Sequence, residues 1–133
     1  MRFTAPPGQP ATEALLTFKG PAEKEGLRVR EAFDLKMVPH EQVVPLLLAL
    51  GFLRQFSFEK DRETWAFRGC LVELDTLPHF GRFVEIEGPS EETVRDVQSE
   101  LGLGGMAPYQ KSYSHIVTEY LDGLKSGSRD LTF

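Results

Sequence analysis

Residues 81–88 have the sequence Gly81-Arg82-Phe83-Val84-Glu85-Ile86-Glu87-Gly88, with a glycine at each end. Polar and apolar side chains alternate along this segment, and a period of two predicts a β-strand. Successive side chains of a strand point to opposite faces, so Val84 and Ile86 share one face while Glu85 and Glu87 share the other. Residues 70–77 and 27–37 also predict strands, and together these segments indicate an antiparallel sheet with one apolar and one charged face.

Charge pairs at this same spacing recur in three other predicted strands. They are Arg28 with Arg30, Lys60 with Arg62, and Glu73 with Asp75. Two interpretations are open. Each pair could lie on the solvated outside of a half-buried sheet. Alternatively, the strands close into a barrel whose charged faces point inward around a hydrated tunnel. Such charges need partners, and a polyphosphate with a divalent metal would supply them, because Arg and Lys bind phosphate and carboxylates bind Mg²⁺ or Mn²⁺.

The remaining elements complete an α+β pattern. Strands are predicted at 13–19, 52–60 and 63–68, and helices at 39–50, 90–101 and 112–124. Pro45 falls inside the first helix and predicts a kink. Ser90 is an expected N-cap. Ser112 and Tyr113 could contact a substrate, or they could be an N-cap and a packed ring. We expect one domain at 1–124, with the helices covering the apolar faces from outside, and a polar tail at 125–133.

Composition excludes several classes of protein. The chain has 133 residues and a formal net charge of −5, which argues against a general nucleic-acid binder. It has no apolar run long enough to span a membrane and no signal peptide, so a cytoplasmic protein is expected. The single cysteine, Cys70, excludes a disulfide framework and is expected to be a packed thiol. His40, His79 and His115 are scattered and do not indicate a shared metal site.

Short motifs in order along the chain resemble the CYTH family. This is the triphosphate tunnel group that includes class IV adenylate cyclases and thiamine triphosphatases. The most specific motifs are Leu-Thr-Phe-Lys-Gly-Pro at 16–21 and Phe-Val-Glu-Ile-Glu-Gly at 83–88. The others are Arg-Val-Arg at 28–30, Gly-Phe at 51–52, Lys-Asp-Arg at 60–62, Leu-Asp at 74–75 and Lys-Ser-Tyr at 111–113.

The resemblance implies an eight-stranded antiparallel barrel, with helices packed outside, whose charged lumen binds a triphosphate and a divalent metal, Mg²⁺ or Mn²⁺. The implied phosphate contacts are Arg2, Lys19, Arg28, Arg30, Lys60, Arg62 and Lys111. The implied metal ligands are Glu73, Asp75, Glu85 and Glu87. No catalytic side chain is assigned.

The sequence departs from the family at its N-terminal end. The family's Glu-x-Glu-x-Lys signature is absent, and Thr4 stands where the family has the second arginine of an Arg-x-Arg strand. The resemblance therefore implies a barrel without its first strand, with an open edge that a homodimer could cover. It favours conversion of ATP to cyclic AMP and pyrophosphate. Hydrolysis of thiamine or inorganic triphosphate is the alternative enzyme activity, and a non-catalytic nucleotide- or polyphosphate-binding domain or a plain structural domain are the alternatives without turnover.

Overall fold

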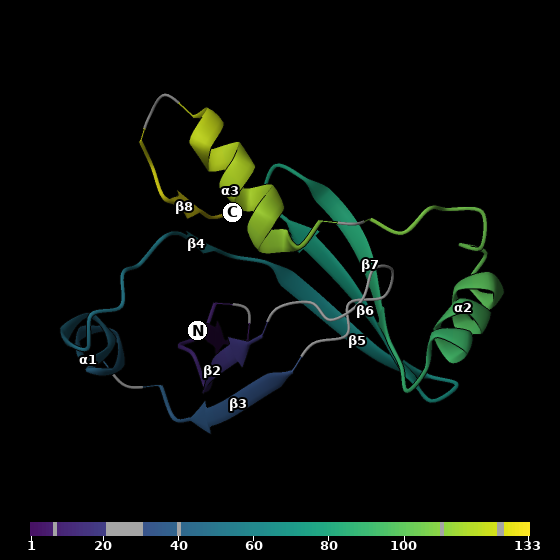
Figure 1. Ribbon diagram of the computed structural model, residues 1–133, viewed down its shortest axis with the longest axis horizontal. Helices are drawn as coiled ribbons and strands as arrows, with labels where there is room; N and C mark the ends of the chain where they lie inside the picture. The colour runs from purple at the N-terminus through teal and green to yellow at the C-terminus, as the bar shows by residue number, and fades with distance from the viewer. Residues whose placement is uncertain (7, 21–30, 40, 110, 125–126) are drawn as a thin grey trace. The chain divides into compact units, whose positions relative to one another are not determined.

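The computed structural model describes residues 1–6, 8–20, 31–39, 41–109, 111–124 and 127–133 (Figure 1). The chain forms two compact units, Met1–Arg54 and Gln55–Phe133. Strands and helices occur in both units, and all strand pairs in the three-stranded sheets are antiparallel. The fold class is α+β, as the sequence predicted.

The first unit contains a three-stranded sheet in the order β1-β2-β3. Its strands are β1 (Arg2–Thr4), β2 (Glu13–Lys19) and β3 (Ala32–Met37). The register pairs Phe18 with Phe33, and their rings lie 6.0 Å apart between centroids. One face is therefore apolar. Arg2 and Lys19 lie on the opposite face, because Arg2 is paired with Leu15 and Leu15 and Lys19 share that face of β2.

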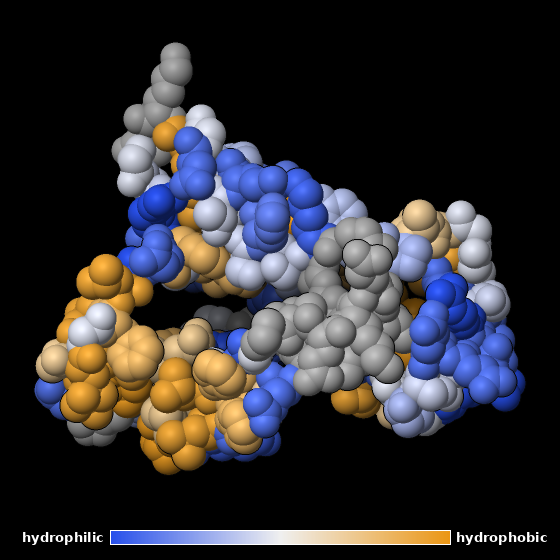
Figure 2. Space-filling view, in the orientation of Figure 1, coloured by the Kyte–Doolittle hydropathy of each residue, from blue (hydrophilic) through white to orange (hydrophobic). Residues whose placement is uncertain are grey.

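The helix of the first unit, α1 (Val43–Ala49), is shorter than the predicted 39–50. It begins late enough that Pro45 is its third residue, where no backbone N–H is needed for an intrahelical hydrogen bond, so Pro45 costs the helix no such bond. Gly51, with a φ of +91°, follows its end as expected. Leu46, Leu48 and Leu50 are exposed, and Figure 2 shows apolar side chains gathered around α1.

The second unit is built on a three-stranded sheet in which neighbouring strands follow one another along the chain. Its strands are β5 (Asp61–Phe67), β6 (Cys70–Leu77) and β7 (Gly81–Glu87). The β5–β6 turn contains Arg68 and Gly69, both with positive φ, as a two-residue hairpin requires. Across the sheet, one row joins Trp65, Val72 and Ile86, and the next joins Thr64, Glu73 and Glu85. The predicted alternation of an apolar and a charged face is confirmed.

Helix α2 (Glu91–Glu100) covers the apolar face at one end of this sheet. Ser90 caps it by accepting a hydrogen bond from the Thr93 backbone N–H. Val97 packs with Cys70 and Val72, so Cys70 is the packed thiol that we expected. Gly88 permits this contact, since a Cβ there would lie 2.6 Å from the Cys70 sulfur.

Helix α3 (Tyr113–Gly123) corrects the expectation that helices cover only apolar faces. It packs against Leu77 and Phe83, which lie on the same face as the charges but at the far end from α2 (Figure 1). The reason is local, because the charged face ends in these apolar residues and offers α3 a surface to bury. Ser112 caps the helix as expected.

A short parallel pair completes this unit. Strand β4 (Ser57–Phe58) pairs with β8 (Asp130–Leu131), so only two residues of the strand predicted at 52–60 are in a ladder. Leu131 is 3% exposed and joins the core beneath α3. The segment expected to be a polar tail therefore contributes a strand and a core residue, because one leucine meets an apolar surface that the sequence pattern does not reveal.

Within the described ranges the strands form three separate sheets, and the closed barrel stays a prediction. The division into a domain at 1–124 and a tail also stays a prediction. No helix in the part of the chain that the structure describes is long and apolar enough to cross a membrane.

Candidate functional site

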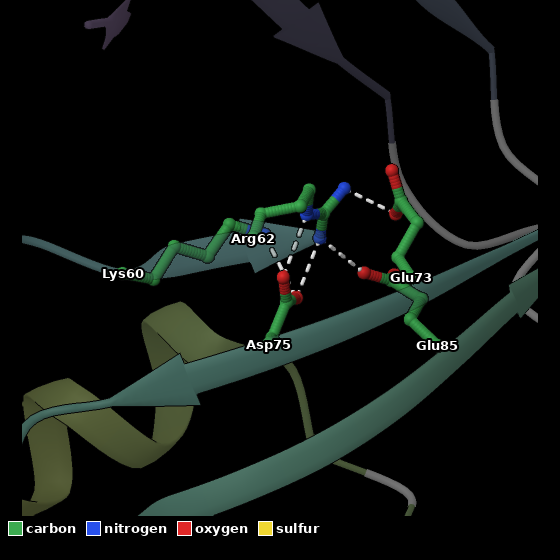
Figure 3. A network of polar contacts seen from close by, with 5 residues as sticks. All are labelled: Lys60, Arg62, Glu73, Asp75 and Glu85. Atoms are coloured by element: carbon green, nitrogen blue, oxygen red, sulfur yellow. Dashed lines mark hydrogen bonds and ion pairs between the residues drawn. The ribbon is translucent and has the colours of Figure 1, made fainter. Parts of the chain in front are cut away.

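Asp75 lies at the centre of a cluster of charges on the polar face of the β5-β6-β7 sheet (Figure 3). Its side chain is fully buried. It accepts hydrogen bonds from Lys60 Nζ at 2.9 Å, from Arg62 Nε at 2.7 Å and from Arg62 Nη2 at 2.6 Å. The register explains the contact, because Arg62 and Asp75 are directly opposite each other on β5 and β6.

Arg62 also contacts two glutamates in the next row of the sheet. Its Nη1 donates to Glu73, and its Nη2 donates to Glu85 at 2.8 Å. Glu73 and Glu85 are cross-strand partners on β6 and β7. One guanidinium group therefore joins three carboxylates from two strands, and its side chain is only 21% exposed.

The pKa values of these groups reflect burial and pairing. Burial opposes the ionised form of Asp75, but the hydrogen bonds from Arg62 and Lys60 outweigh it and hold the pKa of Asp75 below its usual value. Burial lowers the pKa of Lys60, although the hydrogen bond to Asp75 offsets part of that effect. Arg62 keeps a raised pKa despite its burial, because Asp75, Glu73 and Glu85 surround it. Pairing within the cluster thus favours the charged forms of Asp75 and Arg62.

Tyr113 connects the cluster to α3, and the sequence analysis missed this role. Lys60 Nζ lies 5.0 Å from the centroid of the Tyr113 ring, which is a cation–π contact. Phe83 meets the same ring edge-on, with centroids 5.4 Å apart. Burial, followed by a hydrogen bond to Asp75, raises the pKa of the Tyr113 hydroxyl. The sequence signals were its place directly after the N-cap Ser112, which fixes where the helix begins, and the Lys-Ser-Tyr motif at 111–113.

Three glutamates on the same face could hold a metal ion. Glu73, Glu85 and Glu87 each offer a carboxylate oxygen, and these oxygens lie within 4.8 Å of one another. Burial raises the pKa of Glu73, and the charges of Glu87 and Glu85 add to the shift while Arg62 opposes it. Counting Asp75, four carboxylates face two cationic side chains, so the cluster has two negative charges in excess. Oxygen donors with this net charge fit Mg²⁺ or Mn²⁺.

Asp75 differs from the other expected metal ligands. Both of its oxygens are already engaged by Lys60 and Arg62, and it does not belong to the metal-capable group found among the described residues. The two described histidines, His79 and His115, stay apart from that group too. His79 stacks on Tyr120, His115 lies 3.2 Å from Glu119, and His40 is outside the described residues.

The other expected phosphate contacts are placed elsewhere or cannot be described. Lys111 is exposed and donates to both oxygens of Glu119, at 2.8 and 2.5 Å. Arg2 and Lys19 belong to the first unit, on the polar face of its sheet. Arg28 and Arg30 lie outside the described residues. The residues that the structure brings together are Lys60, Arg62, Glu73, Asp75, Glu85 and Glu87.

Comparison with protein families identifies the family of this chain. The family model of the CYTH domain matches residues 8–105. The chain belongs to the CYTH family. The match includes both segments that carried the resemblance, and all six clustered residues lie inside it. CYTH proteins bind triphosphates with metal ions, and the resemblance seen in the sequence is confirmed.

Two solved structures are similar to this CYTH chain. The PH1819 protein from Pyrococcus horikoshii OT3 has a TM-score of 0.69 and 26% sequence identity, over 81% of this chain and 66% of that one. A conserved hypothetical protein from Pyrococcus furiosus has a TM-score of 0.68 and 25% identity, over 77% of this chain and 66% of that one. The chain thus spans 66% of the length of these solved relatives. No curated protein matches it.

Proposed function

We propose that this CYTH protein binds a triphosphate through Lys60 and Arg62 and a divalent cation, Mg²⁺ or Mn²⁺, through Glu73, Glu85 and Glu87. The observation that carries the proposal is that both sets of side chains lie on one sheet face and meet at Arg62. Guanidinium and ammonium groups match phosphate oxygens, while carboxylates match hard cations.

Asp75 has a different role in this proposal from the one expected of it. Its side chain is buried and both its oxygens are bonded to cations, so it orients Lys60 and Arg62 and leaves their remaining N–H groups for phosphate. Tyr113 supports the same arrangement from α3. Arg2, Lys19, Arg28, Arg30 and Lys111 remain proposed phosphate contacts on the grounds of the family motifs.

The reaction favoured by the resemblance is that of a class IV adenylate cyclase. The ribose 3′-hydroxyl of ATP attacks the α-phosphorus, and pyrophosphate leaves. A bound divalent ion would supply charge neutralisation and polarisation of the phosphate oxygens. In this proposal the residues of the chain position the phosphates but do not select the nucleophile. If water attacks in place of the ribose hydroxyl, the protein is a triphosphatase, which is the alternative activity. A binder without turnover is the third candidate.

The architecture that we propose for binding is a barrel built from the two three-stranded sheets, each with its polar face inward. The support is that each sheet, taken by itself, has one polar and one apolar face. A homodimer that covers an open strand edge is part of the same proposal. ATP is abundant in the cytoplasm, where we expect this protein to be.

A thermal-shift and calorimetry series tests the proposal. The ligands are inorganic triphosphate, ATP, thiamine triphosphate and pyrophosphate, each with and without Mg²⁺ or Mn²⁺. A ligand that binds only the folded state raises the melting temperature. Relative to the metal alone, we expect a triphosphate-induced rise that needs the metal and that Arg62→Gln and Glu87→Gln abolish. The matched controls Arg82→Gln and Glu63→Gln, exposed on the other face of the same sheet, should keep it.

Chromatography of ATP reactions then separates the candidates. Cyclic AMP with pyrophosphate identifies a cyclase, ADP with phosphate identifies a hydrolase, and unchanged ATP identifies a binder. The proposal fails if no triphosphate changes the melting temperature, or if the control variants lose binding as completely as Arg62→Gln.

A further inference from the structure

Arg62 is hydrogen-bonded to two carboxylates, Glu73 and Glu85, that the proposed cation would need as ligands. Glu73 and Glu85 are two of the three members of the metal-capable group, and both accept a hydrogen bond from Arg62. Figure 3 shows the guanidinium between Asp75 on one side and these two glutamates on the other. The group proposed to bind phosphate and the groups proposed to bind metal are therefore bonded to each other when no ligand is present.

The contacts of Arg62 divide into two sets. Its Nε and Nη2 are held by Asp75 at 2.7 and 2.6 Å, and Asp75 is fully buried. The contact with Glu85 is on a side chain that is 43% exposed, so solvent and ligands can reach it. The Glu73 side chain is only 10% exposed, so ligands reach this part of Arg62 from the Glu85 side, while Asp75 keeps the guanidinium in place.

We propose that Arg62 is an internal counter-ion that couples the binding of the two ligands. When Arg62 binds phosphate it releases Glu73 and Glu85, and these carboxylates can then bind the cation. This inference rests on the proposed function. A cation that arrives alone must displace the guanidinium or sit beside it, and like charges repel in a site of low dielectric. Phosphate oxygens neutralise the guanidinium and remove that cost. Coupling between two binding sites is reciprocal, so each ligand favours the other.

The coupling makes a prediction that a simple phosphate-binding arginine does not. Arg62→Gln should weaken triphosphate binding and, in the same protein, strengthen binding of the metal alone. We expect the affinity for Mn²⁺ without any phosphate to rise roughly 5- to 150-fold, the usual range for coupled sites. Free Mn²⁺ is measured by electron paramagnetic resonance during titration of the whole chain, so activity is not the readout.

The matched control is Lys60→Gln. It removes one positive charge from the same cluster, but Lys60 is hydrogen-bonded to Asp75 rather than to Glu73 or Glu85, so its effect on Mn²⁺ affinity should be clearly smaller. Arg62→Lys is a second variant that keeps the charge against Asp75 and protects folding. Its single ammonium cannot span three carboxylates, and Mn²⁺ should again bind more tightly than in the wild type.

The outcomes are distinct. Tighter Mn²⁺ binding in both Arg62 variants, with a smaller change in Lys60→Gln, supports the coupling. A different outcome overturns the coupling and leaves the proposed metal site standing. In that outcome the wild type and both Arg62 variants bind Mn²⁺ with equal affinity, and Glu87→Gln does not bind Mn²⁺. A failure of every variant to bind Mn²⁺, with or without triphosphate, overturns the coupling and the proposed function together.

Discussion

Arg62 meets Asp75 in a two-pronged contact, with Nε donating to Oδ1 at 2.7 Å and Nη2 donating to Oδ2 at 2.6 Å. This geometry matches a planar guanidinium to a planar carboxylate, which a lysine at that position could not do. Because Asp75 also accepts a hydrogen bond from Lys60, one buried carboxylate fixes the position of both clustered cations. Asp75 is therefore the residue on which the site depends most.

Asp75→Asn should destabilise the fold. The substitution leaves Lys60 and Arg62 partly buried without their main counter-charge, and breaking such a pair costs about 3 kcal/mol. Urea unfolding at pH 7 in EDTA measures the change in the free energy of unfolding. Asp61→Asn is the control, because Asp61 is exposed on the same β5 strand. Equal losses in the two variants would show that Asp75 has no special structural role.

Ionisation of Asp75 should stabilise the fold, whereas ionisation of Glu73 should destabilise it. The folded pKa of Asp75 lies below its ordinary value of 3.8, so its stabilising contribution is present at neutral pH and is lost as pH falls through that lowered pKa. The folded pKa of Glu73 lies above its ordinary value of 4.5, so ionised Glu73 opposes folding, and this cost appears as pH rises above 4.5.

Glu73→Gln tests that sign. In metal-free protein the variant should be more stable than the wild type at pH 7, and the gain should disappear as pH falls below 4.5, the ordinary pKa of Glu73. Asp75→Asn should instead be less stable at pH 7, with the deficit shrinking only in strong acid. Chemical unfolding curves from pH 3 to pH 8 measure both. A Glu73→Gln variant that is less stable at every pH would contradict the assignment.

Tyr113 should stabilise the charge cluster in two separable ways. Tyr113→Phe removes the hydrogen bond to Asp75 and keeps the ring, at a cost of about 1 kcal/mol. Tyr113→Leu also removes the cation–π contact with Lys60 and should cost roughly 0.5–1 kcal/mol more, beyond the loss of packing. Tyr120→Phe is the control, because its recorded contacts with His79 and Phe80 are made by the ring. In a Lys60→Ala, Asp75→Asn background the hydrogen-bond and cation–π contributions should fall away, and only the packing loss of Tyr113→Leu should remain.

Glu119→Gln should strengthen triphosphate binding if Lys111 is a phosphate contact. Glu119 holds Lys111 in an exposed ion pair, and such pairs contribute little because solvent and salt screen them. Releasing the lysine should therefore raise the affinity by at most about fivefold, with a larger effect at low salt. Calorimetry with inorganic triphosphate measures it. Glu91→Gln, which breaks the exposed pair with Arg95 on α2, should leave the affinity unchanged, and a similar rise there would indicate a general charge effect.

The amino-acid sequence determined which residues share a face. Alternation with a period of two is a property of the extended backbone itself, so Glu73 with Asp75, and Glu85 with Glu87, could be placed on one side of their strands before any strand was paired. Lys60 and Arg62 were paired by their spacing alone, because the predicted strands at 52–60 and 63–68 left Arg62 between them. The N-caps Ser90 and Ser112 were predicted correctly for the same reason, since a capping side chain bonds to the backbone of its own helix. The CYTH motifs added the family, which the family comparison confirmed.

Tertiary structure alone decided which of these residues meet. The cross-strand register made Asp75 a partner of cations rather than a member of the metal-capable group. Packing of α3 on the end of the charged face placed Tyr113 beside Lys60 and buried Leu131. Lys111, which precedes α3, donates a hydrogen bond to Glu119 of that helix. A strand pattern specifies directions within one segment, whereas hydrogen-bond partners depend on distances between segments, and only packing sets those distances.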